Sequence, residues 1–405
     1  MRILQINTTA NSASHGRIAA GIGKQLILGG HESYIAYGRT GKSSESELIK
    51  IGGRIDQSLH LIKSRLFDRH CFGSYHSTSS FIKEIEKTDP DIIHLHNIHG
   101  YYLNIVVLFR YLKNWGKPVI WTFHDTWPIS GHCSFFEHMN CYKWQKECFE
   151  CPNIHGYPKS LYIDNSRRNY REKKELFTGL NDLVLVSPSE WLANHLKNSF
   201  LSGFEIRIIN NGVDINKFSP EIDQTAGKKY LLKKKYILGV ANIWDERKGL
   251  KDFVNLRKIL DREIDIVLVG LSQRQINSLD DGIKGICRTE SIEDLASLYA
   301  GAEIFVNPTY LDNFPLVNIE ALACGTPVIT YRTGGSPESI DKNSGLTVEK
   351  GNVQALHGSV MTVLNEKNFY SAGQCRERAI SKFSSEARNA DYIDLYHERL
   401  MHSPI

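Results

Sequence analysis

A segment in the C-terminal half of the chain combines a helix start with free backbone donors, and this arrangement suits a phosphate. Asp312 and Asn313 follow an apolar, strand-like stretch and stand where a helix N-cap belongs. Pro315 suits the first helical position, because its missing N–H costs nothing there. The N–H groups of Leu316 and Val317 should therefore be free at the positive end of the helix dipole, where a diphosphate binds well.

Two further sets of polar residues could complete such a site. Glu320 lies about one turn along the same helix, where its carboxylate could accept hydrogen bonds from vicinal hydroxyls, as in a ribose. In an earlier loop, Arg247 and Lys248 form a basic turn. Taken alone, these patterns also fit a capped helix with an exposed glutamate and a basic, solvated turn.

Histidines follow two predicted strands in the N-terminal half. His124 comes after the apolar run 118–122, so its side chain is expected at the carboxyl edge of a sheet. A single histidine at a strand end is more often a neutral hydrogen-bonding group of the structure. His94, His96 and His99 alternate along another strand and its loop. Their spacing implies no fixed metal geometry, so we expect them to pack or to line an acceptor-binding cleft.

Four of the eight cysteines lie close together in the sequence. They are Cys133, Cys141, Cys148 and Cys151, and the last two form a Cys-x2-Cys pair before a proline. Four thiolates make a closed tetrahedral zinc site, which is structural because no coordination position stays open. The cluster lies in a long polar and aromatic insert, about residues 125–164, that a metal would hold in one shape. The alternative is four unliganded thiols, since the outer spacings are not those of a standard zinc finger.

The composition is that of an ordinary globular protein. The chain has 405 residues, of which 41% are hydrophobic and 23% charged, and this excludes disordered and collagen-like classes. No apolar run is long enough to cross a membrane, and the first residues do not resemble a signal peptide. We therefore expect a cytoplasmic protein with reduced cysteines. The net charge of +4 is too small to indicate a nucleic-acid partner.

Charge is distributed unevenly along the chain. The first 220 residues carry an excess of basic side chains and the remainder a slight excess of acidic ones, which indicates an anionic partner for the first half. A basic group follows the insert and is either a solvated helix face or a site of attraction for anionic lipid headgroups or a lipid diphosphate. Its members are Arg167, Arg168, Arg171, Lys173 and Lys174.

Apolar strands alternate with longer amphipathic segments, which predicts an α/β protein with doubly wound parallel sheets covered by helices on both faces. The expected strands are 3–6, 34–37, 91–95, 118–122, 183–186 and 206–209 in a first series and 236–240, 264–269, 304–306 and 328–330 in a second. A lysine-rich stretch at 217–235 suits the connection between them. We expect Rossmann-like domains at 1–220 and 221–384, facing a cleft, and a closing helix at 385–405 that packs back on the first domain.

The sequence Glu-Ala-Leu-Ala-Cys-Gly-Thr-Pro-Val-Ile at 320–329 closely resembles the C-terminal signature of family-4 retaining glycosyltransferases of the GT-B fold. Segments 186–191, 209–218 and 333–338 resemble further parts of that family in the expected order. Its members usually show Glu-x7-Glu at the helix start, where this chain has Asp312 in the first position. The resemblance covers most of the chain and extends to capsular and exopolysaccharide enzymes, including the colanic-acid group.

The resemblance implies roles for individual residues. His124 matches the histidine that contacts the donor sugar near the reacting carbon, and Asp312 matches the first acidic residue of the signature. These two are the candidate catalytic residues. The segment 239–249 matches the family's loop that supplies an arginine and a lysine to the donor diphosphate. Lys248 matches the lysine, Asn242 stands at the arginine position without the charged fork of a guanidinium, and Arg247 could compensate. The candidate donor-binding residues are Gly16 in the first loop, Asn242, Arg247, Lys248, Asn313, Phe314, Leu316, Val317 and Glu320.

The implied function is transfer of a sugar from a nucleotide-diphosphate sugar, with retention of configuration and no catalytic metal or cofactor. The implied acceptor is a hydroxyl of a bacterial surface polysaccharide intermediate on a lipid carrier, which would bring the enzyme into peripheral contact with the cytoplasmic face of the inner membrane. The main alternative is a sugar-phosphate synthase or phosphorylase on the same fold. A zinc-stabilised nucleic-acid- or partner-binding protein is a weaker one, and steeply salt-dependent polynucleotide binding would support it.

Overall fold

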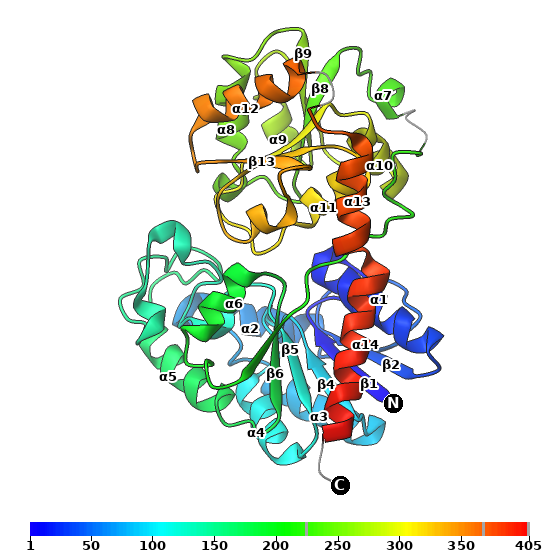
Figure 1. Ribbon diagram of the computed structural model, residues 1–405. Coiled ribbons are helices and arrows are strands. Elements are labelled where there is room, and N and C mark those ends of the chain that lie inside the picture. Colours follow the sequence, from blue (N-terminus) through cyan, green and yellow to red (C-terminus); the bar gives the residue numbers. More distant parts are fainter. Residues whose placement is uncertain (223–225, 367–368, 403–405) are drawn as a thin grey trace. The chain divides into compact units, whose positions relative to one another are not determined.

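The computed structural model describes residues 1–222, 226–366 and 369–402 of the chain. The chain divides into two compact units (Figure 1): Met1–Asn210 with Arg388–Ile405, and Asn211–Ala387. The stretch 217–235, predicted as a connection, belongs to the second unit, and its residues 223–225 lie outside the described residues. Residues 403–405 of the predicted closing helix also lie outside them.

The first unit contains a parallel sheet of seven strands in the order β3-β2-β1-β4-β5-β6-β7. Every residue of β4, β5 and β6 is buried, as expected of a sheet that helices cover on both faces. The strands are β1 (Arg2–Asn7), β2 (Glu32–Tyr37), β3 (Glu47–Lys50), β4 (Ile92–Leu95), β5 (Val119–Thr122), β6 (Leu183–Ser187) and β7 (Glu205–Ile208).

The helices of the first unit are α1 (Ala13–Leu28), α2 (Arg54–Phe67), α3 (Tyr75–Thr88), α4 (Ile105–Trp115), α5 (Ser166–Phe177) and α6 (Glu190–Lys197). Between β5 and α5 the insert contains only short turns of 3-10 helix, which are η1 (Trp127–Ile129), η2 (Glu137–Met139) and η3 (Lys143–Gln145). An insert with so little regular structure depends on side-chain contacts or a bound ion for its shape.

The last helix, α14 (Ser385–His402), contributes to the core of the first unit. It lies beside α1, and Tyr392 and Tyr396 share an apolar cluster with Ile22 of that helix (Figure 1). The Tyr396 hydroxyl is 2.7 Å from His94 Nδ1, and the Tyr392 hydroxyl is 3.1 Å from Thr122 Oγ1. The end of the chain thus satisfies buried polar groups of β4 and β5.

The second unit contains a parallel sheet of six strands in the order β10-β9-β8-β11-β12-β13. The strands are β8 (Lys235–Val240), β9 (Ile264–Val269), β10 (Ile283–Ile286), β11 (Ile304–Asn307), β12 (Val328–Tyr331) and β13 (Gly345–Val348). The helices are α7 (Ala226–Lys229), α8 (Leu250–Arg257), α9 (Gln273–Ile276), α10 (Ile292–Ala300), α11 (Leu316–Ala323), α12 (Val353–Asn365) and α13 (Ala372–Phe383), with 3-10 turns η4 (Glu246–Lys248) and η5 (Ser336–Ser339).

The predicted fold class is confirmed, since both units are doubly wound α/β sheets. Three strands were not predicted: β3, β10 and β13, all of which lie at sheet edges. Each has only four residues, and each has two half-buried or exposed residues or more, so the apolar run that marks a central strand is missing. None of the described helices has the length and apolar character that crossing a membrane requires.

Candidate functional site

The loops after β8 and β11 bring a predicted cation and a predicted carboxylate together. Lys248 Nζ lies 2.5 Å from Asp312 Oδ2, and the two side chains are 18% and 21% exposed. Asp245 accepts from the Lys248 N–H and so caps the turn that carries the lysine. The loops can approach because residue 249 is glycine: its φ is +76°, and a Cβ there would lie 2.2 Å from the Pro308 carbonyl oxygen. A largely buried ion pair therefore stands at the carboxyl edge of the second sheet.

Arg247 and Asn242, the two candidates for a further diphosphate contact, differ in their surroundings. Arg247 Nη1 donates to the Leu311 carbonyl at 2.8 Å, and its Nη2 lies 3.8 Å from Asp245 Oδ2. Arg247 thus fastens η4 to the segment that precedes α11. Asn242 is exposed in the loop after β8, so a ligand can reach it without breaking such a contact.

The helix that follows Asp312 begins later than the sequence predicts. Pro315 is the N-cap of α11, so neither Asp312 nor Asn313 caps the helix, and Pro315 is not its first residue. Proline was expected inside the first turn because its missing N–H costs nothing there; at the N-cap its extended backbone ends the loop instead. Leu316 and Val317 are the first two helical residues, and the N–H groups at a helix start have no acceptor within the helix.

Phe314, predicted to bind the donor, is a core residue of the second unit. Its side chain is 3% exposed, and its ring centroid lies 5.4 Å from that of Phe383. The Phe314 carbonyl accepts from Asn211 Nδ2 at 2.9 Å. Asn313, its neighbour, is also buried. Their side chains therefore pack inside the loop before α11.

A buried polar network beneath α11 was not predicted. Asn318 Nδ2 donates to Ser336 Oγ at 3.1 Å and to Ser339 Oγ at 2.9 Å. Its Oδ1 accepts from Asn307 Nδ2 at 2.8 Å, and Thr330 Oγ1 lies 2.7 Å from Ser336 Oγ. The network joins the ends of β11 and β12 to α11 and η5, so it determines where the helix start lies. Apart from Glu320, Asn318 is the only polar residue of α11, and this asparagine was the signal that could have revealed the network.

Glu320 is on α11, one turn after the helix start, but it is buried. Its exposed fraction is 5%, and Tyr299 donates from its hydroxyl to Oε2 at 3.1 Å. Tyr299 comes from α10 and is itself completely buried. The tyrosine holds the carboxylate in one orientation, a role that the sequence alone did not assign to it.

In the first unit, a chain of hydrogen bonds determines which nitrogen of His124 carries the proton. Gln5 donates through Nε2 to the Ala19 carbonyl at 2.8 Å, so its Oε1 accepts from His96 Nε2 at 3.0 Å. Burial lowers the pKa of His96 and of His124 well below the usual value, so both rings are neutral. His96 Nδ1 is then an acceptor, and His124 Nε2, 3.1 Å away, donates to it. This leaves Nδ1 as the acceptor nitrogen of His124.

Gly16 lies in the first turn of α1 and not in the predicted loop. A Cβ at this position would lie 2.6 Å from Thr9 Oγ1, so glycine allows the helix to approach the loop after β1. Its neighbour His15, which was not predicted, has its ring centroid 5.8 Å from that of His124. His15 Nδ1 lies 2.8 Å from Asn7 Oδ1. A histidine beside the single glycine of this turn was the available signal.

The remaining predicted histidines bind protein groups. His99 Nε2 lies 2.7 Å from Asp125 Oδ2, and both residues are buried. Burial alone would raise the pKa of Asp125, but the charge of His99 and the Trp127 N–H lower it below its usual range. His94 Nε2 lies 2.8 Å from Thr122 Oγ1. Polar and ionic groups therefore gather at the carboxyl edge of the first sheet as well.

Acid is expected to destabilise the first unit through His15. Burial lowers the pKa of His15 to about 4 from the 6.5 of an unperturbed histidine. Because the pKa of His15 is lower in the folded state, the unfolded state takes up the proton first as the pH falls. The folded state therefore keeps its full stability with respect to His15 above about pH 6.5 and loses stability as the pH falls toward about 4. Between about pH 7.5 and about pH 5 the free energy of unfolding should fall by about 2 kcal/mol more in the wild type than in His15→Gln. Denaturant unfolding at the two pH values measures this, and equal losses would exclude His15 as the cause.

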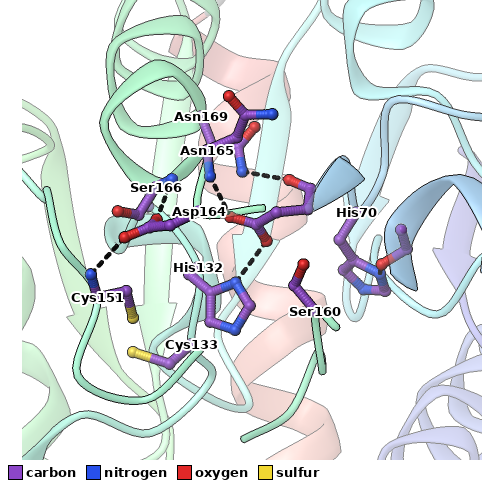
Figure 2. Close-up of polar contacts among 12 residues, drawn as sticks. His70, His132, Cys133, Cys151, Ser160, Asp164, Asn165, Ser166 and Asn169 are labelled. Carbon is purple, nitrogen blue, oxygen red and sulfur yellow. Dashed lines mark hydrogen bonds and ion pairs between the residues drawn. The ribbon is translucent and has the colours of Figure 1, made fainter. Parts of the chain in front are cut away.

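The four cysteines of the insert are free thiols that line one cavity. Figure 2 shows the sulfurs of Cys133 and Cys151 turned toward each other, beside His132. Within the part of the chain that the structure describes, no group of three or more His, Cys, Asp and Glu side chains is arranged to hold a metal ion. Zinc therefore stays a prediction.

The basic group on α5 is largely paired within the protein. Arg168 forms an ion pair with Glu172 at 2.6 Å, and Arg171 forms one with Glu147. Lys173 is buried and donates to backbone carbonyls of the insert. These contacts favour a solvated, ion-paired helix face over a binding surface for anionic lipid.

Two doubly wound units with polar groups at the carboxyl edges of their sheets define the GT-B class of folds, and comparison with solved structures supports this. The sucrose-phosphate synthase of Thermosynechococcus elongatus has a TM-score of 0.73 at 18% identity, and the match covers 99% of this chain and 100% of that one. HepE of Anabaena, solved in complex with UDP, has a TM-score of 0.69 at 14% identity, covering 98% and 100%. At such identities the likeness shows the fold alone.

The family follows from the sequence. Residues 16–217 match the model of Glycosyltransferase Family 4, and residues 234–366 match that of Glycosyl transferases group 1. The two matches together cover most of the chain. The chain therefore belongs to this family of glycosyltransferases, as its resemblance to the family's signature indicated. The chain is 26% identical to WcaC of Escherichia coli K12, named as a colanic acid biosynthesis glycosyl transferase, over 98% of this chain and 99% of that protein.

Proposed function

We propose that this glycosyltransferase moves a sugar, with retention of configuration, from a nucleotide-diphosphate sugar to a hydroxyl of a lipid-linked polysaccharide intermediate. The observation that carries the proposal is the Lys248–Asp312 pair next to the start of α11, which offers a cation and backbone donors to a diphosphate. The name of the full-length relative WcaC supports a polysaccharide acceptor, and the UDP in the HepE structure supports a nucleotide donor. The lipid carrier would bring the enzyme into peripheral contact with the membrane.

In this proposal the second unit binds the donor. The ammonium of Lys248 leaves Asp312 for the diphosphate, and the N–H groups of Leu316 and Val317 bind a phosphate oxygen. Glu320, oriented by Tyr299, accepts hydrogen bonds from the ribose hydroxyls. These groups stabilise the negative charge that develops on the leaving diphosphate, the role that a divalent cation fills in other transferases. No metal is assigned to the reaction.

His124 is the proposed contact of the first unit to the donor sugar. Its acceptor nitrogen Nδ1 receives a hydrogen bond from a sugar hydroxyl, and the neutral ring places no positive charge next to the developing oxocarbenium carbon. The bond from the anomeric carbon to the diphosphate oxygen breaks while a bond to the acceptor oxygen forms on the same face. The acceptor proton passes to the leaving phosphate oxygen, so no protein nucleophile is required.

A panel of UDP-, GDP- and other nucleotide sugars tests the proposal through thermal stabilisation and release of the nucleoside diphosphate. One nucleotide should stabilise the protein, and Glu320→Ala should weaken its binding about 10-fold or more, since hydrogen bonds to charged groups are worth about 1.5–3 kcal/mol. Glu349→Ala, which removes an exposed glutamate of the same unit, is the matched control. Unchanged nucleotide affinity in Glu320→Ala would show that Glu320 is not part of the donor site. Failure of every nucleotide to bind would contradict the proposal.

The alternatives predict different results in the same assay. Turnover that depends on orthophosphate or on a sugar phosphate as acceptor would favour a phosphorylase or a sugar-phosphate synthase, an activity for which the fold is equally suited. Steeply salt-dependent binding of a polynucleotide, without binding of any nucleotide sugar, would favour a nucleic-acid-binding protein.

A further inference from the structure

The cavity that the four cysteines line also contains a histidine. Besides these cysteines, His132, Lys143 and several aromatic residues form its wall. Its volume of about 10 Å³ is enough for one ion or one water molecule. The cavity thus has the size and the sulfur donors of a site for a single soft metal ion.

His132 has one ring nitrogen bound and one without a partner. Its side chain is completely buried, and Nδ1 lies 2.5 Å from Asp68 Oδ1. Asp68 is held in turn by the Asn165 N–H, which donates to Oδ2 at 2.9 Å. Nε2 of His132 is buried and has no hydrogen-bond partner in the described parts of the chain. A buried nitrogen of this kind points to a missing partner in the cavity, and a histidine oriented by a carboxylate is typical of metal sites.

The backbone around the cysteines is already held in place. The Gly131 N–H donates to Cys148 Sγ at 3.2 Å. Lys143 Nζ donates to the carbonyls of Phe149 and Glu150, at 2.9 Å and 3.0 Å, and so fixes the Cys-x2-Cys turn. Asp164, near the far end of the insert, accepts from the Cys151 N–H at 2.6 Å (Figure 2). Hydrogen bonds therefore hold the loop that carries the thiols at several points.

The charge around the cavity also suits a thiolate site. A zinc ion with four thiolates carries a net charge of −2, which needs compensation in a buried place. Lys143 lines the cavity, and Lys173 is buried behind it, donating to the carbonyls of Trp127 and Ser130 at 2.8 Å and 2.9 Å. Lys143 therefore places a positive charge next to such a complex, and His132 offers it a hydrogen-bond donor.

We propose that Cys133, Cys141, Cys148 and Cys151 bind one structural zinc ion in this cavity, and that His132, positioned by Asp68, donates its Nε2–H to one of the thiolates. The thiols surround the cavity without yet standing in ligand positions, so their side chains turn inward on binding. Each of the four loses its proton to solvent as its bond to zinc forms. The ion then holds the insert, which begins directly after His124, and the site is independent of the proposed donor chemistry.

The metal content of the full-length chain tests the zinc site. Protein purified without a metal-binding tag should contain one zinc per chain by mass spectrometry, and four thiols should become reactive when a strong chelator removes it. The double variant Cys148→Ser/Cys151→Ser should lose the zinc, while Cys287→Ser, which replaces an exposed cysteine of the second unit, should retain it. If the double variant does not fold, the chelator experiment on the wild type still shows whether the four thiols bind zinc.

Two results would overturn the proposal. One is a wild-type protein that contains no zinc and binds none when zinc is added. The other is a Cys133–Cys151 disulfide in the native protein. The part played by His132 has its own measurement: His132→Gln should keep one zinc per chain but bind it about 10- to 100-fold more weakly in competition with a coloured chelator. Unchanged affinity would remove His132 from the site.

Discussion

Replacement of Lys248 by alanine is expected to lower kcat by about 100- to 1000-fold, which corresponds to about 3–4 kcal/mol of transition-state stabilisation. The ammonium is about four-fifths buried, and Asp312 holds it next to the start of α11, so a diphosphate bound there meets a positioned cation once the ion pair opens. Negative charge on the diphosphate grows as the bond to the sugar breaks, and a fixed cation stabilises this state more than the bound substrate. The effect should therefore appear in kcat as well as in kcat/KM.

The control for this prediction is Lys258→Ala, which removes an exposed lysine after the end of α8 in the same unit. Its kcat should equal that of the wild type. A Lys248→Ala enzyme that raises KM and keeps kcat would show that the lysine binds the donor without acting on the transition state. An enzyme with both constants unchanged would remove Lys248 from the site.

Replacement of Asn318 by alanine is expected to lower the free energy of unfolding of the second unit by about 3 kcal/mol. The change leaves Asn307 Nδ2 without its acceptor and removes one hydrogen bond from each of the hydroxyls of Ser336 and Ser339, all in a fully buried place. A buried polar group that loses its hydrogen bond costs about 1–3 kcal/mol. Because the network positions the start of α11, nucleotide affinity should fall together with stability.

Hydrogen exchange resolved by peptide measures the loss directly, since it reports the second unit without requiring the whole chain to unfold in one step. Amides of α11, β11 and β12 should exchange faster in Asn318→Ala, while those of the first sheet keep their rates. Asn343→Ala, at an exposed asparagine, should leave all of them unchanged. Equal protection of α11 in Asn318→Ala and wild type would contradict the role of the network.

The alternation of apolar runs with amphipathic segments was sufficient to predict the architecture, because the central strands of parallel sheets are continuous apolar runs. β5, for example, has only buried residues and was predicted at 118–122. Edge strands lack this signal: β10 reads Ile-Lys-Gly-Ile, and its middle residues are only half-buried. The start of α11 was placed too early because Asp312 is a good capping residue by type, whereas in the fold its carboxylate pairs with Lys248.

At the candidate site, too, residues of local sequence motifs could be predicted, whereas contacts between residues far apart in the sequence could not. Lys248, Asp312 and Glu320 could be named because each belongs to a local motif of a family with a known signature. Their partners could not be named, since Tyr299 reaches Glu320 across 21 positions of sequence, and no local pattern records that contact. His132 was missed in the same way, because its significance depends on Asp68, which lies 64 positions earlier.

The most direct measurement is calorimetric titration of the wild type and Lys248→Ala with nucleoside diphosphates, in buffer freed of divalent cations on a chelating resin. The proposed donor site predicts one binding site per chain for UDP, GDP or a related diphosphate, tight binding without added metal, and a clear loss of affinity in Lys248→Ala. Binding that appears only after magnesium or manganese is added, or no binding of any nucleoside diphosphate, would contradict a donor site built from Lys248 and the start of α11.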